Sequence, residues 1–401
     1  MNKLIHTPEG VKDIYGRDYF RARRTLFRIS DELERFGFMR ITTPSFEYFD
    51  IFSGKVGIGK ERELYKFVDK ENNTLVLRPD FTPGIARVYS KYFADSKVPV
   101  RLTYRGNVFK NLEGLQGKMK ESYQIGAELI GDPSCAADAE VIAANIKCIL
   151  AGGLRDFRLT LGHPGFIMGI LKEADLDDDT MDALAEEITV KNCFAIVDIL
   201  RDLDIPEEKK RLITNLPFLM GSPELLEKAK GMVENEESLA AIERLREIYD
   251  LLGTYNMQKY ISFDLGMYSK LRYYTGVIFK AYADGAGEPV TTGGRYDSLI
   301  KKFGCDAPAV GFVLCMETFM QALNSKDSRI EETTKGAILI YEEDSLKEAI
   351  AFAEEKRSEG GIIELIPRVP GLEIKDHIMD AKQMVINEAY VASKGKIEKA
   401  L

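Results

Sequence analysis

The chain has few of the residues that build metal centres and disulfides, and it has no long apolar run. Its three histidines, His6, His163 and His377, lie far apart in the sequence, which argues against a structural zinc site. Its five cysteines are scattered, odd in number and without a C-x-x-C pair, so we expect reduced thiols. No stretch approaches about 18 apolar residues and no secretory signal opens the chain, so we expect a cytoplasmic protein without a membrane span or a metal.

Basic residues are also in deficit. The 55 Lys and Arg residues are outnumbered by 64 Asp and Glu residues, which gives a net charge of −9 and a pI of about 5.3. Phosphate contacts need clustered cations, so this balance argues against tRNA as the main partner, although it leaves a local basic patch open. At 401 residues, 45% hydrophobic and 30% charged, the chain is expected to form two or three globular domains.

The stretch 101–131 has the pattern of a β-hairpin with a basic loop. Strand-like residues 101–105 are followed by a loop rich in Gly and Lys, after which a second strand-like run returns. On that return run Gln124, Gly126 and Glu128 recur at period two and therefore share one face. Two polar side chains beside a glycine indicate either the floor of a polar ligand site or a solvated sheet face.

The N-terminal region predicts a helix over residues 17–36, because apolar residues recur there every three or four positions. Gly37 is placed to end this helix in a left-handed conformation, and residues 38–42 predict a short strand leading to Pro44. The sequence leaves open whether this helix–strand unit belongs to the core or to an oligomer interface.

A polar trio, Arg78, Asp80 and Thr82, follows a strand-like run at residues 75–78 and is bounded by prolines. Polar side chains at the end of a strand are typical of a ligand rim. The alternative is that Asp80 or Thr82 caps the helix that follows. Both interpretations can hold together.

The remaining chain alternates between helical and sheet character. Residues 165–258 predict a helix-rich insertion with solvated charged faces. Strand patterns return after it, and Gly293 and Gly294 within them predict a bulge or a close backbone approach. Residues 325–335 read as a linker to a small α/β unit at 336–401.

Five motifs together give the chain a family resemblance. They are Thr7–Gly10, Leu77–Thr82, the 104–131 hairpin with Gln124-x-Gly-x-Glu128, Tyr273–Gly276 and Gly293–Asp297. Over residues 5–323 the chain resembles the core of histidyl-tRNA synthetase, a class II synthetase. The resemblance implies an α+β fold: a mixed antiparallel sheet with flanking helices over residues 1–324, the helical insertion within it, and a C-terminal unit similar to a shortened anticodon-binding domain.

The resemblance also implies a histidine site. The residues that match the family's histidine-binding positions are Asp80, Thr82, Gln124, Glu128, Tyr273, Tyr274 and Tyr296. Asp80 matches a carboxylate that meets the α-ammonium group, and the tyrosines match residues around the imidazole. Carboxylates suit an ammonium group, and tyrosines can both stack and hydrogen-bond.

Three positions depart from the synthetase pattern. Arginines that stabilise adenylate formation in the family are replaced by Lys110, Ser269 and Thr318. Lysine does not replace arginine at a bidentate phosphate site, and Ser and Thr carry no charge. Loss of one such donor typically costs about 3 kcal/mol of transition-state stabilisation, so we expect a chain that recognises the amino acid but does not activate it.

That combination resembles the regulatory subunits of short-form ATP phosphoribosyltransferase, a paralogue of the synthetase. The resemblance implies a non-catalytic protein of histidine biosynthesis that needs no cofactor, takes histidine as regulatory ligand, activates a short catalytic subunit and mediates feedback inhibition. It also implies a self-dimer through the region 17–44.

The alternatives are an active histidyl-tRNA synthetase, which the unit at 336–401 keeps open, and a stand-alone amino-acid-binding protein.

Candidate anion-binding residues are Lys110 and Arg295, with Lys118 and Lys120 in the hairpin loop. For the two loop lysines a solvated surface role is the simpler interpretation. For Arg295 a structural ion pair is the equal alternative.

Overall fold

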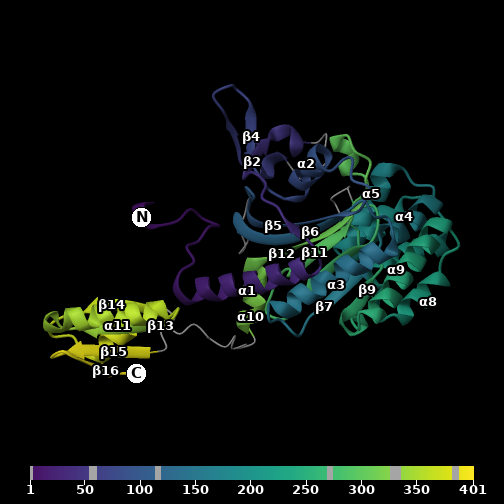
Figure 1. Ribbon diagram of the computed structural model, residues 1–401. Coiled ribbons are helices and arrows are strands. Elements are labelled where there is room, and N and C mark those ends of the chain that lie inside the picture. The colour runs from purple at the N-terminus through teal and green to yellow at the C-terminus, as the bar shows by residue number, and fades with distance from the viewer. Residues whose placement is uncertain (1–2, 54–60, 113–118, 269–273, 326–335, 382–387) are drawn as a thin grey trace. The chain divides into compact units, whose positions relative to one another are not determined.

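A computed structural model describes residues 3–53, 61–112, 119–268, 274–325, 336–381 and 388–401 (Figure 1). The chain divides into two compact units. One comprises Met1–Val11 and Leu26–Asp327, and the other comprises Lys12–Thr25 and Ser328–Leu401. Within the described ranges, no helix has both the length and the apolar character needed to cross a membrane.

The first unit is built on a nine-stranded mixed sheet, and most of its neighbouring strands are antiparallel. In spatial order the strands are β1 (Met39–Arg40), β5 (Val100–Phe109), β6 (Glu121–Ile130), β12 (Ala309–Cys315), β11 (Thr291–Arg295), β10 (Ile278–Tyr282), β7 (Arg158–Gly162), β9 (Ile261–Asp264) and β8 (Met220–Gly221). Only the pairs β1–β5 and β7–β9 of this described sheet are parallel. The α+β class and the mixed antiparallel sheet are thus confirmed.

The predicted hairpin is the pair β5–β6. Its antiparallel register runs from Val100 opposite Ile130 to Phe109 opposite Glu121. This register puts Tyr104 opposite Gly126, and Glu128 opposite Leu102. The tip of the loop, including Lys118, lies outside the described residues.

The described core contains the helix predicted over residues 17–36 together with further helices. Its helices are α1 (Gly16–Arg35), α2 (Thr82–Tyr92), α3 (Cys135–Ala151) and α10 (Met316–Ser325). Gly37, with φ of +77°, follows α1 as the predicted left-handed glycine. Helix α3 is apolar nearly all round, and its Ile142, Ile146 and Ile149 are fully buried. It packs on β6, β11 and β12 on one side and on the insertion on the other.

The predicted insertion is confirmed as helix-rich. Its helices are α4 (Pro164–Glu173), α5 (Asp178–Thr189), α6 (Cys193–Arg201), α7 (Glu207–Asn215), α8 (Glu224–Lys230) and α9 (Glu236–Thr254). It also supplies β8, which pairs with β9 and so extends the main sheet. Helix α9 lies against both α3 and α4 (Figure 1).

A second, three-stranded sheet joins β2 (Phe46–Tyr48), β4 (Thr74–Leu77) and β3 (Lys66–Val68). Short 3-10 helices complete the chain: η1 (Lys3–Ile5), η2 (Phe49–Ile51), η3 (Glu61–Glu63), η4 (Leu216–Phe218), η5 (Gln258–Tyr260), η6 (Ile300–Phe303) and η7 (Glu343–Ser345). Asn72, in the turn between β3 and β4, adopts a positive φ of 63°.

The C-terminal unit is a small α/β sheet. Its elements are β13 (Gly336–Tyr341), α11 (Leu346–Ser358), β14 (Ile362–Pro367), α12 (Ile374–Ala381), β15 (Glu388–Ser393) and β16 (Lys396–Lys399). They form the small α/β unit that was predicted at 336–401. The last two strands were not predicted, because their Ala-, Glu- and Lys-containing sequences carry little β propensity; β15 is organised by pairing with β13, and β16 by pairing with β15.

Candidate functional site

The centre of the candidate site is Glu128 on β6, a carboxyl group that is only 2% exposed. Three hydroxyl groups reach it from different parts of the chain. Thr82 Oγ1 and Tyr104 Oη donate to its Oε1 atom at 3.0 and 3.1 Å, and Tyr296 Oη donates to Oε2 at 2.6 Å. The site therefore joins the start of α2, the hairpin and the segment after β11.

Two glycines leave the space for this cluster. A Cβ atom on Gly311 of β12 would lie 1.5 Å from Oε2 of Glu128, its cross-strand neighbour. A Cβ atom on Gly126 would lie 2.4 Å from Tyr104 Oη. The space beside Gly126 on this face of β6 is thus filled by Tyr104, which reaches Glu128.

Burial raises the pKa of Glu128 to about 8, and the charge of nearby Asp80 adds to that shift. The hydrogen bonds from Tyr296, Thr82 and Tyr104 act in the opposite direction. Burial also raises the pKa of Tyr104 well above its usual value. Near neutral pH Glu128 therefore holds a proton, and a cationic or N–H-donating ligand would favour its ionised form.

Asp80 lies at the edge of the cluster and is half-buried. Its Oδ1 atom accepts a hydrogen bond from the backbone N–H of Thr82 at 3.0 Å. This is the contact that the helix-capping alternative requires, although the N-cap position of α2 is Phe81. Asp80 thus supports the start of α2, and its charge remains next to Glu128.

The position of Arg78 beside Asp80 suggested that it lies on a ligand rim. The structure shows that it does not. It is buried, and its guanidinium donates to the carbonyl oxygens of Thr43, Pro44 and Asn107 at 2.9, 3.1 and 2.8 Å. The same group lies 4.0 Å from the centre of the Phe81 ring, which stacks on Tyr104 at 4.5 Å. Arg78 therefore supports the site indirectly, through the ring of Phe81 that stacks on Tyr104.

The remaining predicted residues lie around this cluster in different degrees. Gln124 is partly exposed on β6, two residues before Gly126. The ring of Tyr274 covers Gly294, where a Cβ atom would come within 2.7 Å of it. Tyr274 also lines a cavity of about 310 Å³ together with Tyr268. Tyr273 lies outside the described residues.

The Gly293–Gly294 pair is explained by close approach. Pairing of β11 with β10 and β12 is continuous through both glycines, so this part of the described sheet contains no bulge there. A Cβ atom on Gly293 would lie 2.5 Å from the Phe279 ring and from the Gly311 carbonyl oxygen.

The positions of the replaced arginines carry little positive charge. Lys110 is exposed just beyond the end of β5, and Lys120 faces it across the hairpin through a backbone hydrogen bond of 2.8 Å. Thr318 is half-buried in the first turn of α10. Ser269 lies outside the described residues.

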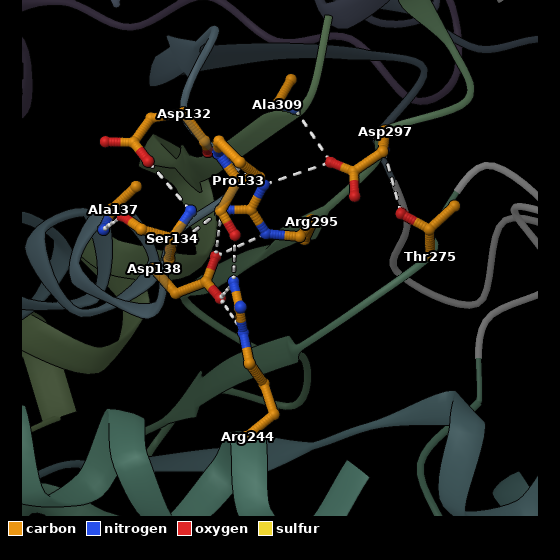
Figure 2. Close-up of polar contacts among 10 residues, drawn as sticks. All are labelled: Asp132, Pro133, Ser134, Ala137, Asp138, Arg244, Thr275, Arg295, Asp297 and Ala309. Atoms are coloured by element: carbon orange, nitrogen blue, oxygen red, sulfur yellow. Dashed lines mark hydrogen bonds and ion pairs between the residues drawn. The ribbon is translucent and has the colours of Figure 1, made fainter. Parts of the chain in front are cut away.

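Arg295, a candidate anion ligand, is 4% exposed and pairs with Asp138 at 2.7 Å (Figure 2). These contacts are those of a structural ion pair, which was the alternative to an anion-binding role for Arg295.

Sequence reasoning missed Tyr104 and Gly311. Tyr104 had only a weak signal, because its place opposite Gly126 depends on the register of the hairpin, which the sequence pattern did not fix. Gly311 has no comparable local signal, since its role depends on β12 pairing with β6 across the sheet.

Comparison with known proteins identifies the family of the chain. The sequence model of the histidyl-tRNA synthetase family matches residues 10–319. The ATP phosphoribosyltransferase regulatory subunit of Acetivibrio thermocellus is 36% identical over 361 residues, which cover 90% of this chain and 86% of that protein. The protein of the same name from Caldanaerobacter subterraneus subsp. tengcongensis is 36% identical over 382 residues, covering 94% and 99% of the two chains.

A solved structure gives the same result. The crystal structure described as an ATP phosphoribosyltransferase regulatory subunit/histidyl-tRNA synthetase from Bacillus halodurans C superposes with a TM-score of 0.83 at 30% identity. The match covers 94% of this chain and 96% of that one. The chain therefore belongs to the histidyl-tRNA synthetase family and, within it, to the ATP phosphoribosyltransferase regulatory subunits.

Proposed function

We propose that this chain is a non-catalytic regulatory subunit that binds histidine and a short ATP phosphoribosyltransferase catalytic subunit. In that complex it activates the first step of histidine biosynthesis and transmits feedback inhibition by histidine. The names of its relatives support the regulatory role and the partner. Reciprocal coupling between a histidine site and a distant active site would account for both effects.

The observation that carries the proposal is the buried Glu128 cluster. A buried carboxyl group with three hydroxyl donors and no arginine among them is suited to a ligand that brings its own positive charge or N–H donor. Histidine offers an α-ammonium group and an imidazole N–H. Asp80 is suited to the ammonium group, and Glu128 with Tyr274 and Tyr296 to the imidazole.

The same chain lacks the cations that ATP activation needs. Lys110, Ser269 and Thr318 stand where the synthetases use arginines, and at about 3 kcal/mol for each lost donor the adenylation step would be slowed by several orders of magnitude. The region 336–401 also contains 13 acidic and 9 basic residues, which is unfavourable for tRNA. We therefore propose that the chain has no tRNA partner. We also propose a cytoplasmic location.

A self-dimer through the region 17–44 fits the exposed apolar side chains near it. Met39, Phe46 and Tyr48 are between 50% and 58% exposed, and Phe27 is 39% exposed. Neighbouring exposed apolar side chains on a globular surface are typical of an interaction site.

Two measurements on the purified chain test the proposal. Calorimetry should detect histidine binding, and ATP–pyrophosphate exchange with histidine should stay at background. Addition of the chain to a short phosphoribosyltransferase should raise its activity and make it sensitive to histidine. Robust exchange would instead support the synthetase alternative, and binding without any effect on the transferase would support a stand-alone amino-acid-binding protein.

A further inference from the structure

A second buried carboxylate, Asp138 on α3, joins two distant parts of the first unit. It is fully buried and contacts two guanidinium groups (Figure 2). Arg295 of β11 binds its Oδ1 atom through Nε at 2.8 Å and Nη2 at 2.7 Å. Arg244 of α9 binds Oδ2 through Nε at 2.9 Å and Nη2 at 2.6 Å. We call these three residues the Asp138 cluster.

The Arg295 end of the cluster is fixed by further contacts. Its Nη1 atom binds Asp297 Oδ1 at 3.1 Å and the carbonyl oxygen of Asp132 at 3.1 Å. Asp297 in turn accepts from the backbone N–H of Ala309 at 3.1 Å, and its own N–H donates to Thr275 Oγ1 at 2.9 Å (Figure 2). The guanidinium therefore binds the segment before α3 directly and, through Asp297, is linked to Thr275 and Ala309.

These contacts lead directly to the ligand-facing tyrosines. Tyr296 follows Arg295, and because neighbouring residues point to opposite faces, Arg295 reaches α3 while Tyr296 reaches Glu128. Backbone hydrogen bonds from Thr275 N to Arg295 O at 2.8 Å and from Arg295 N to Val277 O at 2.9 Å hold the segment that begins with Tyr274. The position of Arg295 thus sets the positions of both tyrosines.

The Arg244 end belongs to the insertion. Its Nη2 atom also binds the carbonyl oxygen of Pro133, just before α3. Helix α9 packs on α3 and α4, so a displacement of α9 would change the contacts of Oδ2 of Asp138. The carboxylate that anchors Arg295 is therefore shared with a helix of the insertion.

We propose that Asp138 and Arg295 are positioning residues for Tyr296 and Tyr274, and that Arg244 makes their placement depend on the position of helix α9. The inference rests on the proposed function in one respect, that the pocket binds histidine. It adds that the insertion controls this pocket through a shared carboxylate, so that a partner acting on α9 would alter affinity for the ligand.

The test uses Arg244→Gln, because Arg244 is the most exposed member of the cluster and Arg295 still neutralises Asp138 in that variant. Its matched control is Arg101→Gln, which breaks the bidentate Arg101–Glu140 pair made by the same helix α3. The side chain of Arg244 binds Asp138 and the Pro133 carbonyl oxygen, and that of Arg101 binds Glu140.

The first readout is hydrogen exchange of the full chain without ligand. Peptides spanning 274–297 should exchange faster in Arg244→Gln than in the wild type, and should be unchanged in Arg101→Gln. Arg244→Lys, which keeps the charge, should restore part of the protection. Unchanged exchange of these peptides in a folded Arg244→Gln variant would overturn the inference, whether or not the pocket binds histidine.

The second readout is a double-mutant cycle for histidine affinity. Arg244→Gln should weaken binding by about three- to ten-fold in the wild type and by clearly less in Tyr296→Phe, since a positioning residue acts through the group that it places. Arg101→Gln should have the same small effect in both backgrounds. Additive losses would contradict the inference, whereas a wild-type chain that does not bind histidine would contradict the proposed function instead.

Discussion

Glu128 and Asp138 are two carboxyl groups buried on the two faces of one sheet, and the protein treats them differently. Burial raises the pKa of Asp138 too, but two guanidinium groups act against that rise and neutralise its charge within the fold. Glu128 receives only hydroxyl groups, and its pKa is raised to about 8. A buried carboxylate with built-in counter-charges is structural, whereas one without them is poised for a ligand that supplies the charge.

The same contrast separates Arg295 from the positions of the replaced arginines. Arg295 is retained and its donors contact the protein's own oxygen atoms. Lys110 and Thr318 stand where external phosphate would need to be held, and neither offers a bidentate donor. Arg295 therefore serves the architecture of the fold.

The largest expected effect is that of Asp138→Asn on stability. The substitution leaves Arg295 and Arg244 facing a neutral amide, and breaking a buried ion pair in this way typically costs about 3–5 kcal/mol. Urea unfolding followed by circular dichroism measures it. The control is Glu140→Gln, which removes a half-buried partner from the same helix and should cost about 1 kcal/mol. Equal losses of stability in the two variants would show that the charge of Asp138 contributes no more to the fold than the charge of Glu140.

The second expected effect concerns Glu128 and pH. Its folded-state pKa of about 8 lies above the ordinary value of 4.5, so the folded chain keeps a proton that the unfolded chain loses. The resulting stability is fully present below pH 4.5 and is lost as the pH rises through 8, by an amount on the order of 4–5 kcal/mol. Glu128→Gln cannot titrate, so its stability relative to the wild type should rise between pH 5 and pH 9. A constant difference across that range would show that Glu128 is already ionised.

The third effect is on ligand affinity. Asp80→Ala should weaken histidine binding by about 2 kcal/mol, because it removes the carboxylate expected to meet the α-ammonium group, while the fold is retained. Isothermal calorimetry measures the affinity, and Asp95→Ala, which removes an exposed carboxylate of the same unit, is the control. Unchanged affinity in Asp80→Ala would remove Asp80 from the pocket.

The smallest expected change in stability tests the space around Glu128. Gly311→Ala would place a Cβ atom 1.5 Å from Oε2, so the carboxyl group must move, at a cost of about 1–3 kcal/mol. Histidine affinity should fall with it. Gly287→Ala, where a Cβ atom meets no neighbour within 4 Å, should change neither stability nor affinity. Normal affinity in Gly311→Ala would mean that the position of Glu128 does not determine binding.

Much of the fold could be predicted because its signals are local. The spacing of apolar residues predicted α1 to within one residue at each end, and the period-two pattern predicted that Gln124, Gly126 and Glu128 share a face of β6. Strands β15 and β16 gave no such signal, since they depend on pairing, β15 with β13 and β16 with β15, rather than on their own residues.

By itself the sequence determined the helices, the hairpin, the residue types of the candidate pocket and the replacement of three arginines. Only the tertiary structure decided that Arg295 serves an ion pair, because its partner Asp138 lies 157 residues away in the chain. It also decided that Glu128 keeps a proton, because its burial, which outweighs the opposing hydroxyl groups of Thr82, Tyr104 and Tyr296, is set by packing between distant segments. Periodicity is a property of neighbouring residues, whereas burial and charge pairing belong to the assembled fold.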